Sequence, residues 1–380
     1  MRQLMFIKKR TLEWREADDL VLQASTDALV RPFAVARCDL DTAFLNRSLT
    51  APLRLAAELH WFDPRIKYDL GKQPFKGPFP YGHECVAEVI AVGADVRGVN
   101  IGDVVIVPFQ VSCGKCLTCQ SGRTAQCDTD RPAPISAYGF GDPTGAWGGA
   151  MSDIVRIPHA EHMLVQVPDG VDPIALASAS DNIPDGWRGV GPHLKRNPGA
   201  PVLVVGGRAR SVGLYGAALA VAMGAERVDF VSSDRHSLEI AERVGANPVE
   251  IKPGKKSYRE RLSSGKRYPI SFDASGLPGA LDFAIRSLSP GGVCTNAFFY
   301  FRKSTPMPVW EMYVKSLSFE TGLADVSASL PDILELTKSG AFKPELVTTL
   351  VADWEDAPNA FLDPTAKVVV TRERINPPRA

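Results

Sequence analysis

The second half of the chain alternates between apolar, strand-like runs and helix-like segments, and this alternation restricts the fold more than any other feature. The runs "APVLVVGG", "RVDFVSS" and "YPISFDASG" are typical of buried strands. Segments with helical spacing separate them, as in "SVGLYGAALAVAMGA" and "DRHSLEIAERVGA". Repetition of strand, helix and strand predicts an α/β fold with a parallel, doubly wound sheet, in which each helix crosses from one strand to the next.

The chain up to about residue 170 has a different texture. The runs "DALVRPFAVARC", "CVAEVIAVG" and "GDVVIVPF" are separated by glycine and proline and predict a folded-over β domain. Residues 46–76 interrupt this pattern with one or two helical turns and a polar, proline-bearing stretch. We expect a long surface excursion that either roofs a substrate cleft or serves as a plain insert or subunit contact.

The overall charge excludes one class of partner. Lysine plus arginine and aspartate plus glutamate both number 43, so the net charge is zero and no basic surface for nucleic acid is expected. The start "MRQLMFIKKR" lacks the layout of a secretory signal, and no uninterrupted apolar run reaches the length of a membrane span. The expected location is the cytoplasm, with no membrane partner.

Four of the seven cysteines lie in the short loop "CGKCLTCQSGRTAQC". They are Cys113, Cys116, Cys119 and Cys127. Clustered thiols in a reducing compartment favour a metal site over disulfides, and four thiolates around one ion are typical of structural zinc. An iron–sulfur cluster and four unliganded buried cysteines are the alternatives. A closed shell of four thiolates has no open position, so the chemistry is expected elsewhere.

A second set of ligand-type residues is spread along the chain. Cys38 stands in "ARCDLDTAF", His83 and Glu84 in "PYGHECVAEV", and Asp181 in "SASDNIPDGW". Each is weak evidence alone, because an isolated cysteine beside a strand is usually buried filler. Together, the thiolate of Cys38, the imidazole of His83 and the carboxylate of Asp181 would form a three-ligand zinc site whose fourth position is left for water or substrate.

These motifs, in this order, resemble the zinc-containing medium-chain alcohol dehydrogenases over nearly the whole chain. Cys38 and Asp41 match the family's C-x-x-D pattern, "GHE" matches the second ligand, and "ASDNIPDGW" is similar to the "LSDxxPTGY" stretch of the formaldehyde-dehydrogenase-like branch. The resemblance implies a GroES-like catalytic domain over residues 1–176, with a zinc lobe at about 110–130. It also implies a Rossmann domain over 177–318 and a return to the first domain over 319–380.

The resemblance also implies an activity. A zinc-dependent oxidoreductase of this kind transfers a hydride between NAD(P) and an alcohol, aldehyde or ketone, and carries one catalytic and one structural zinc per subunit. Glu84 would be a neighbour of the metal that tunes it, and Asp41 would either orient the loop or help to replace a missing proton relay. That relay is usually a serine or threonine, where this chain has Leu40. The family's usual assembly is a homodimer or homotetramer.

The glycine-rich turn departs from the usual dinucleotide fingerprint. It reads "VVGGRARSVG", with two arginines among the glycines that the fingerprint needs for the tight turn and for close packing. The arginines could pair with phosphate or crowd it. The candidate cofactor-binding residues of this turn are Gly206, Gly207, Arg208, Arg210, Ser211, Val212 and Gly213.

The end of the second strand of this domain predicts the choice of cofactor. An acidic residue there binds the adenine ribose of NAD and repels the 2′-phosphate of NADP. Here Ser232 and Ser233, followed by Arg235, favour NADP, whereas Asp234 could take the acidic role and favour NAD. Asp185 lies where the family often has a threonine beside the nicotinamide, and "VCTNAFFY" places Ala297 and Phe298 along the same ring.

The sequence leaves two alternative functions open. A zinc-free quinone or enoyl reductase shares the fold but lacks the four-cysteine loop and the Cys38–His83 pair. A zinc-binding, non-enzymatic homologue with a decayed cofactor turn would account for Arg208 and Leu40.

Overall fold

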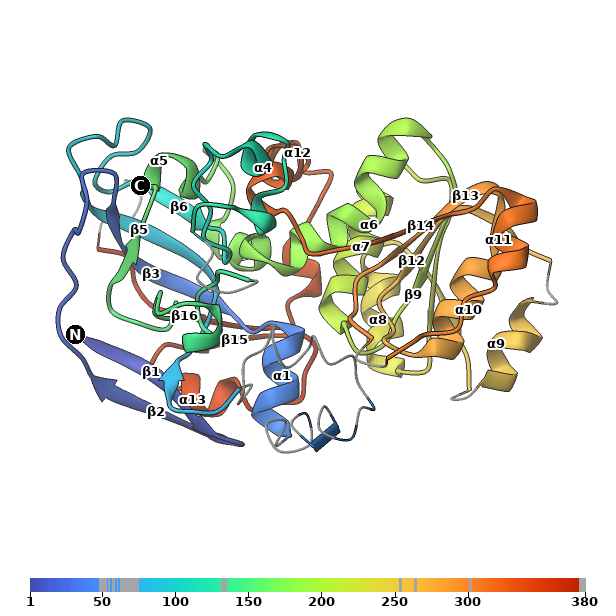
Figure 1. The fold of residues 1–380 in the computed structure, drawn as a ribbon, viewed down its shortest axis with the longest axis horizontal. Coiled ribbons are helices and arrows are strands. Elements are labelled where there is room, and N and C mark those ends of the chain that lie inside the picture. Colours follow the sequence, from blue (N-terminus) through green and yellow to red (C-terminus); the bar gives the residue numbers. More distant parts are fainter. Residues whose placement is uncertain are drawn as a thin grey trace. The chain divides into compact units, whose positions relative to one another are not determined.

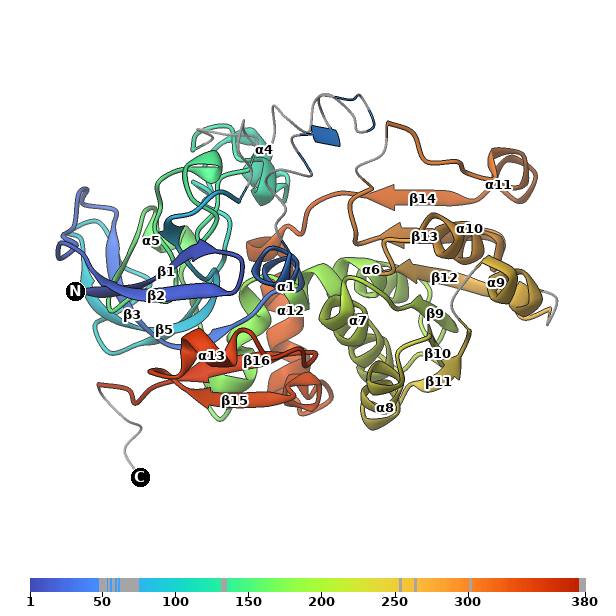
Figure 2. The ribbon, with the colours of Figure 1, turned by 90° about the horizontal axis from the view of Figure 1, so that it is seen from below.

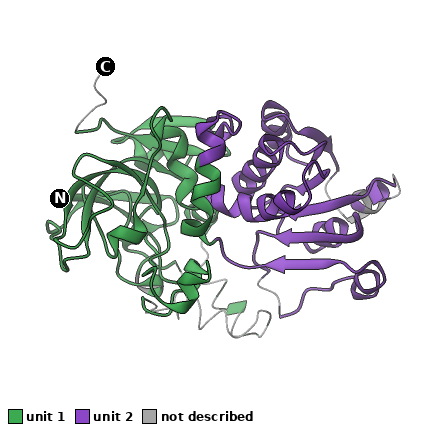
Figure 3. Ribbon diagram, turned by 90° about the horizontal axis from the view of Figure 1, so that it is seen from above, with its two compact units in different colours: residues 1–181, 325–334, 348–380 green, residues 182–324, 335–347 purple. Residues whose placement is uncertain are grey.

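The computed structural model describes residues 1–47, 75–130, 135–252, 255–262, 265–300 and 303–375, with the single positions 53, 55, 56, 59 and 61. The contacts within the chain divide it into two compact units (Figure 3). Unit 1 comprises Met1–Asp181, Asp325–Leu334 and Thr348–Ala380, and unit 2 comprises Asn182–Ala324 and Glu335–Val347. No helix in the described ranges is long and apolar enough to cross a membrane.

Unit 1 is built on β-strands, as predicted for the first part of the chain (Figure 1). Most of its strand pairs are antiparallel, whereas β15 and β16 pair in parallel. Its strands are β1 (Arg2–Lys8), β2 (Thr11–Glu16), β3 (Ala28–Ala36), β4 (Phe79–Pro80), β5 (Glu84–Val92), β6 (Val104–Val107), β7 (Val155–Ile157), β8 (Val165–Gln166), β15 (Leu350–Asp353) and β16 (Val368–Thr371). One sheet has the order β2-β1-β4 and the other β15-β16-β3-β5-β6-β8, with β7 also paired to β3. The last strand, β16, therefore lies beside β3, which ends next to Cys38.

Short helices connect these strands. They are α1 (Asp39–Asn46), α4 (Leu117–Gln120), α5 (Ala160–Met163), α13 (Ala357–Ala360) and the 3₁₀ segments η1 (Thr124–Gln126), η2 (Asp142–Thr144) and η3 (Pro173–Ser180). The predicted excursion over residues 46–76 lies largely outside the described residues. Its first residue, Asn46, is the last residue of α1. Near its other end, the ring of Phe75 stacks on Phe44 of that helix, with ring centroids 5.2 Å apart.

Unit 2 confirms the predicted doubly wound sheet. Its strands are β9 (Val202–Val205), β10 (Val228–Ser232), β11 (Asn247–Glu250), β12 (Tyr268–Asp273), β13 (Leu288–Asn296) and β14 (Ser318–Thr321). All neighbours are parallel, in the order β11-β10-β9-β12-β13-β14 (Figure 2). The order reverses between β9 and β12, and the carboxyl ends of strands at such a switch point are where doubly wound folds bind ligands.

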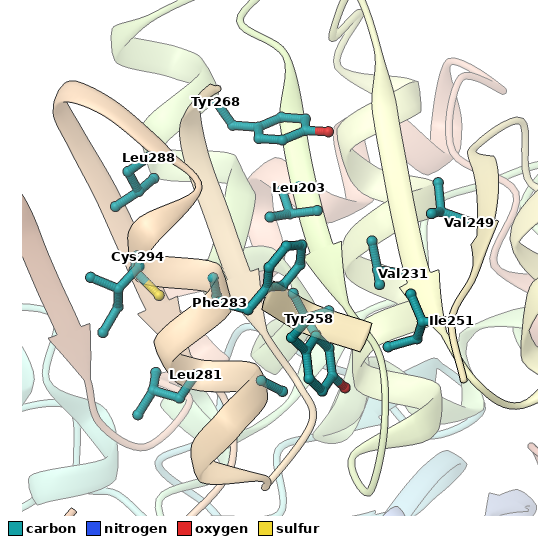
Figure 4. Packing of buried hydrophobic residues seen from close by; sticks show 14 residues of the cluster. Leu203, Val231, Val249, Ile251, Tyr258, Tyr268, Leu281, Phe283, Leu288 and Cys294 are labelled. Carbon is teal, nitrogen blue, oxygen red and sulfur yellow. The ribbon is translucent and has the colours of Figure 1, made fainter. Parts of the chain in front are cut away.

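Helices cover both faces of this sheet (Figure 2). They are α6 (Asn182–Arg196), α7 (Arg210–Ala222), α8 (Arg235–Arg243), α9 (Lys255–Leu262), α10 (Pro278–Arg286) and α11 (Val309–Lys315), with η4 (Pro344–Val347) nearby and α12 (Val326–Lys338) shared by the two units. Side chains of β9, β10 and β12 pack against α9 and α10 in one apolar core (Figure 4). Leu203, Val231 and Phe283 are almost fully buried there, and each such side chain contributes about 1.5–3 kcal/mol.

A buried carboxylate lies near the start of β10. The side chain of Asp229 is fully buried and accepts hydrogen bonds from the Tyr268 hydroxyl and from Asn247 Nδ2 at 2.7 Å. Arg227 and Lys266 lie 3.3 and 3.5 Å from it. Burial by itself raises the pKa of this carboxyl, but the hydrogen bonds and the two cations outweigh burial and hold the pKa below its ordinary value.

We expect Asp229→Asn to lower the free energy of unfolding by about 1–3 kcal/mol at neutral pH, because the amide cannot replace the charge that its partners face. Since the folded pKa is depressed, the stabilisation is present above the ordinary pKa of 3.8 and is lost as the pH falls through the folded value. Urea unfolding at several pH values should show the variant and the parent converging in acid. The exposed Glu226→Gln is the matched control, and a difference independent of pH would contradict the assignment.

Candidate metal and cofactor sites

Cys38 is held where β3 ends and α1 begins. Its backbone is extended, with φ −73° and ψ 159°, and its Sγ accepts the Leu40 N–H at 3.4 Å. In return, the carboxylate of Asp41 accepts the Cys38 N–H at 3.1 Å, which completes a capping box. The same Asp41 oxygen accepts the Tyr81 hydroxyl at 3.1 Å. This geometry supports the structural reading of Asp41, a side chain that orients the loop around Cys38.

His83 precedes β5 and is almost completely buried. Its ring lies against Phe140 and Phe109, with centroids 4.5 and 5.5 Å away. Nδ1 faces Asp41 Oδ1 at 3.7 Å, and Nε2 lies 3.4 Å from Asp181 Oδ2. Neither nitrogen has a well-aligned hydrogen bond, so the imidazole presents two unsatisfied atoms in a buried site.

Asp181 follows η3, which is tied to the strands around His83. The Ser180 Oγ donates to the carbonyl of Cys85 at 2.9 Å and accepts its N–H at 3.0 Å. The carbonyl of Ser180 accepts the N–H of Phe109 at 3.1 Å. These bonds fix the end of η3 beside β5, and this places the next side chain, Asp181, against His83.

The structure brings together the four ligand-type residues that the sequence singled out. One ligand atom from each of Cys38, His83, Glu84 and Asp181 lies within 4.8 Å of the others. Burial, and then the charges of Asp181 and Glu84, raise the pKa of the Cys38 thiol well above its ordinary value. A divalent cation would reverse this penalty, because it pairs with thiolate and carboxylate and fills the unsatisfied side of His83. The donor set of sulfur, nitrogen and oxygen fits zinc.

A lysine that the sequence analysis missed completes the surroundings of Glu84. Lys367, in the segment before β16, donates to Glu84 Oε2 at 2.7 Å and to the Arg37 carbonyl at 2.9 Å. Both side chains of the Lys367–Glu84 pair are fully buried. The other carboxylate oxygen, Oε1, has no hydrogen-bond partner. Burial raises the pKa of Glu84 to about 7 against the opposing charge of Lys367. The sequence did contain a signal for this buried pair. Lys367 directly precedes the apolar run "VVV", and a lysine is almost never buried unless it is paired with an opposite charge.

The four-cysteine loop forms a second compact cluster. One sulfur from each of its cysteines lies within 4.8 Å of the others. Backbone N–H groups point at the sulfurs: Cys116 and Lys115 donate to Cys113 Sγ, and Cys119 donates to Cys116 Sγ, all at 3.3–3.4 Å. The N–H groups of Asp128 and Cys119 lower the pKa of the Cys116 thiol to about 6. Backbone donors that favour thiolate suit a metal held by four sulfurs.

The glycine-rich turn lies between β9 and α7. A side chain on Gly206 would collide with Phe230, one on Gly207 with Ser275, and one on Gly213 would press on Ala274. The three glycines therefore permit close packing of the turn and of α7 on the sheet. Arg208 is exposed, and α7 begins at Arg210, so Ser211 and Val212 lie in the first turn of this helix.

The loop after β10 contains the residues expected to decide between the two cofactors. Ser232 is buried at the strand end, Ser233 is exposed, and Asp234 directly precedes α8. The Asp234 carboxylate lies 3.5 Å from the Arg210 guanidinium of the glycine-rich turn. Arg235 is 82% exposed and lies 3.4 Å from Glu250. Arg235, the cation that the sequence suggested would select NADP over NAD, is therefore paired with Glu250 and not placed beside Ser232.

The remaining predicted cofactor residues lie near the ends of α6 and β13. Asp185 accepts a hydrogen bond from Arg188 Nε at 2.5 Å, and Arg188 also donates to the Asn296 carbonyl at 2.8 Å. Ala297 continues from β13 with its N–H bonded to the Asp273 carbonyl at 2.9 Å. The ring of Phe298 stacks on Phe299 with centroids 4.7 Å apart.

Comparison with known proteins agrees with both halves of this description. Residues 24–169 match the alcohol dehydrogenase GroES-like domain, and residues 211–338 match the zinc-binding dehydrogenase domain. A medium chain reductase/dehydrogenase of Acremonium sp. is 32% identical over 62% of this chain and 78% of its own. A glutathione-independent formaldehyde dehydrogenase of Pseudomonas aeruginosa is 38% identical over 52% of this chain and 47% of its own. An alcohol dehydrogenase of Thermus sp. ATN1 has a structure of the same fold, with 26% identity, coverage of 98% and 99%, and a TM-score of 0.79.

The fold and these matches define an oxidoreductase with a GroES-like domain followed by a Rossmann domain. The chain belongs to the medium-chain dehydrogenase/reductase family and carries the GroES-like and zinc-binding dehydrogenase domains of alcohol dehydrogenases.

Proposed function

We propose that this protein is a zinc-dependent, NAD(P)-linked oxidoreductase that transfers a hydride between the nicotinamide and a small alcohol, aldehyde or ketone. The observation that carries the proposal is the convergence of Cys38, His83, Glu84 and Asp181, whose ligand atoms lie within 4.8 Å of one another in a buried site. Cys38, His83 and Asp181 would hold the catalytic zinc, and the four-cysteine cluster would hold a structural one. When bound, the catalytic zinc supplies a Lewis acid that polarises the substrate oxygen and favours an alkoxide near neutral pH.

The chain's own residues would prepare this centre in three ways. Asp41 faces Nδ1 of His83 and so directs Nε2 toward the other ligands, which is the common role of a carboxylate behind a metal-bound histidine. Phe140 and Phe109 cover the imidazole and keep water from that side. Lys367 holds Glu84 by Oε2, and Oε1 is left without a hydrogen-bond partner.

In this proposal, unit 2 binds the nicotinamide cofactor and provides the contact between subunits. NADP is the favoured nucleotide, since Ser232 and Ser233 at the end of β10 are small and uncharged. Assembly as a homodimer or homotetramer is supported by the exposed apolar surface of α11. That surface comprises Val309, Trp310, Tyr313 and Val314, each more than half exposed.

Metal analysis and nucleotide titration of the full-length protein test this function together. We expect two zinc ions per chain and saturable quenching of tryptophan fluorescence by NADPH or NADH. Alcohols and aldehydes should then change the absorbance of the reduced nicotinamide. A single zinc per chain that is retained after replacement of Cys38 would contradict the catalytic metal site. No nucleotide binding at millimolar concentration would instead indicate a zinc-binding protein without enzymatic activity.

A further inference from the structure

Two features of unit 2 meet at the place where the adenosine end of a dinucleotide is expected. One is the loop after β10, where Asp234 follows Ser232 by two residues and its N–H donates to Ser232 Oγ at 3.1 Å. The other is the glycine-rich turn, whose Arg210 Nε lies 3.5 Å from Asp234 Oδ2. Asp234 Oδ2 also accepts the hydroxyl of Ser237 at 2.5 Å. Asp234 is therefore contacted from two sides, by a hydroxyl of α8 and by a cation from a different element.

Two backbone N–H groups of the turn are engaged within the protein. The N–H groups of Arg208 and Ala209 donate to the carbonyls of Ser275 and Ala274, each at 3.1 Å. These amides do not point at a phosphate, as the backbone of a dinucleotide turn commonly does. Phosphate groups at this turn would consequently be met by arginine side chains and by the first N–H groups of α7.

We propose that Arg210 determines cofactor specificity, by neutralising Asp234 and by binding the 2′-phosphate of NADP. This inference rests on the proposed function. A carboxylate in this loop would otherwise accept hydrogen bonds from the ribose of NAD and repel a 2′-phosphate. With Arg210 beside it, the pair carries no net charge, and an incoming phosphate gains a guanidinium that can donate two hydrogen bonds at once.

The contacts of the side chains favour Arg210 over Arg235, because Arg210 lies beside Asp234 and Arg235 lies beside Glu250. The side chains of Arg210 and Asp234 are 35% and 42% exposed, so a ligand can reach the pair. Arg235, which the sequence offered as the discriminating cation, is directed to Glu250 and lies almost fully in solvent. The side chain at position 232, a serine, is small and uncharged and therefore does not repel a phosphate.

The test is the binding of NADPH and NADH to the full-length protein, measured by calorimetry or tryptophan fluorescence without any substrate. We expect Arg210→Ala to weaken NADPH by about 10- to 100-fold, the usual cost of a lost charge-assisted hydrogen bond. NADH should change far less, because it lacks the 2′-phosphate but shares the pyrophosphate. Arg210→Lys should restore part of the affinity for NADPH, since it returns the charge without the planar fork.

Two neighbouring substitutions sharpen the result. Arg235→Ala is the matched control and should leave both affinities near the parent values. Asp234→Ala should tighten NADPH, because a repelling charge is removed. Equal weakening of NADPH and NADH in Arg210→Ala would overturn the proposal and assign Arg210 to the pyrophosphate. The proposal would also be overturned if Arg235→Ala, and not Arg210→Ala, selectively weakened the binding of NADPH. Failure of the parent protein to bind either nucleotide would remove the proposed function itself.

Discussion

Under the proposed function, replacing Cys38 with alanine should remove one of two zinc ions per chain and lower the rate of hydride transfer at least about a thousandfold. A Lewis acid at the reacting oxygen is worth several kcal/mol of transition-state stabilisation, and each 1.36 kcal/mol corresponds to a factor of ten in rate. Cys38 is the only sulfur ligand in its group, and its loss leaves His83 and Asp181 to hold the ion. Elemental analysis and the absorbance of the reduced nicotinamide give the two readouts on one preparation.

The four-cysteine cluster and a neighbouring buried thiol provide the controls for this experiment. Cys85 is buried on β5, two residues from His83, and is not part of either ligand group. Cys85→Ala should retain two zinc ions and most of the activity. If Cys38→Ala kept both zinc ions, or lost its metal but kept its rate, the assignment of Cys38 to a catalytic zinc would be wrong.

Replacing Lys367 with methionine should destabilise the protein by about 3–5 kcal/mol, the usual cost of removing one partner from a buried ion pair. The Nζ atom of Lys367 lies 2.7 Å from Glu84 Oε2, and both side chains are fully buried. Methionine keeps the apolar stem of the lysine but leaves a carboxylate without its cation. Denaturation in urea, on samples of known zinc content, measures the loss.

The double variant Lys367→Met with Glu84→Gln separates charge from packing. Removing both charges should recover most of the lost stability, because the penalty comes from the unpaired carboxylate and not from the missing contact. The double variant also keeps the test valid if the single variant does not fold. A double variant no more stable than the single one would show that Lys367 acts through its bond to the Arg37 carbonyl.

The parallel sheet of unit 2 was predictable because its signal is local. The strands Val202–Val205, Val228–Ser232 and Tyr268–Asp273 are rich in apolar residues, and most of their side chains are buried, as is typical of strands covered on both faces. The intervening helices show the period of 3.6 residues. Parallel strands need crossovers, so the order of the elements along the chain was enough to predict a doubly wound fold.

The partners of the site residues were less predictable. Lys367 and Glu84 are separated by 283 positions, and no local pattern relates them. The pairing of Arg210 with Asp234 was equally hidden, since the sequence placed Arg235 closer to Ser232 and could not show that Glu250 engages it. Such pairs depend on where strands end in space.

Sequence alone determined the candidate ligand types, their spacing and the order of the two matched domains. Those features follow from residue chemistry and from short-range periodicity, which any stretch of chain carries by itself. Tertiary structure decided which oxygens face the histidine, which lysine compensates Glu84 and which arginine meets Asp234. Those outcomes depend on burial and on distances of a few ångströms between distant segments, because charges interact strongly only after folding has removed the water between them.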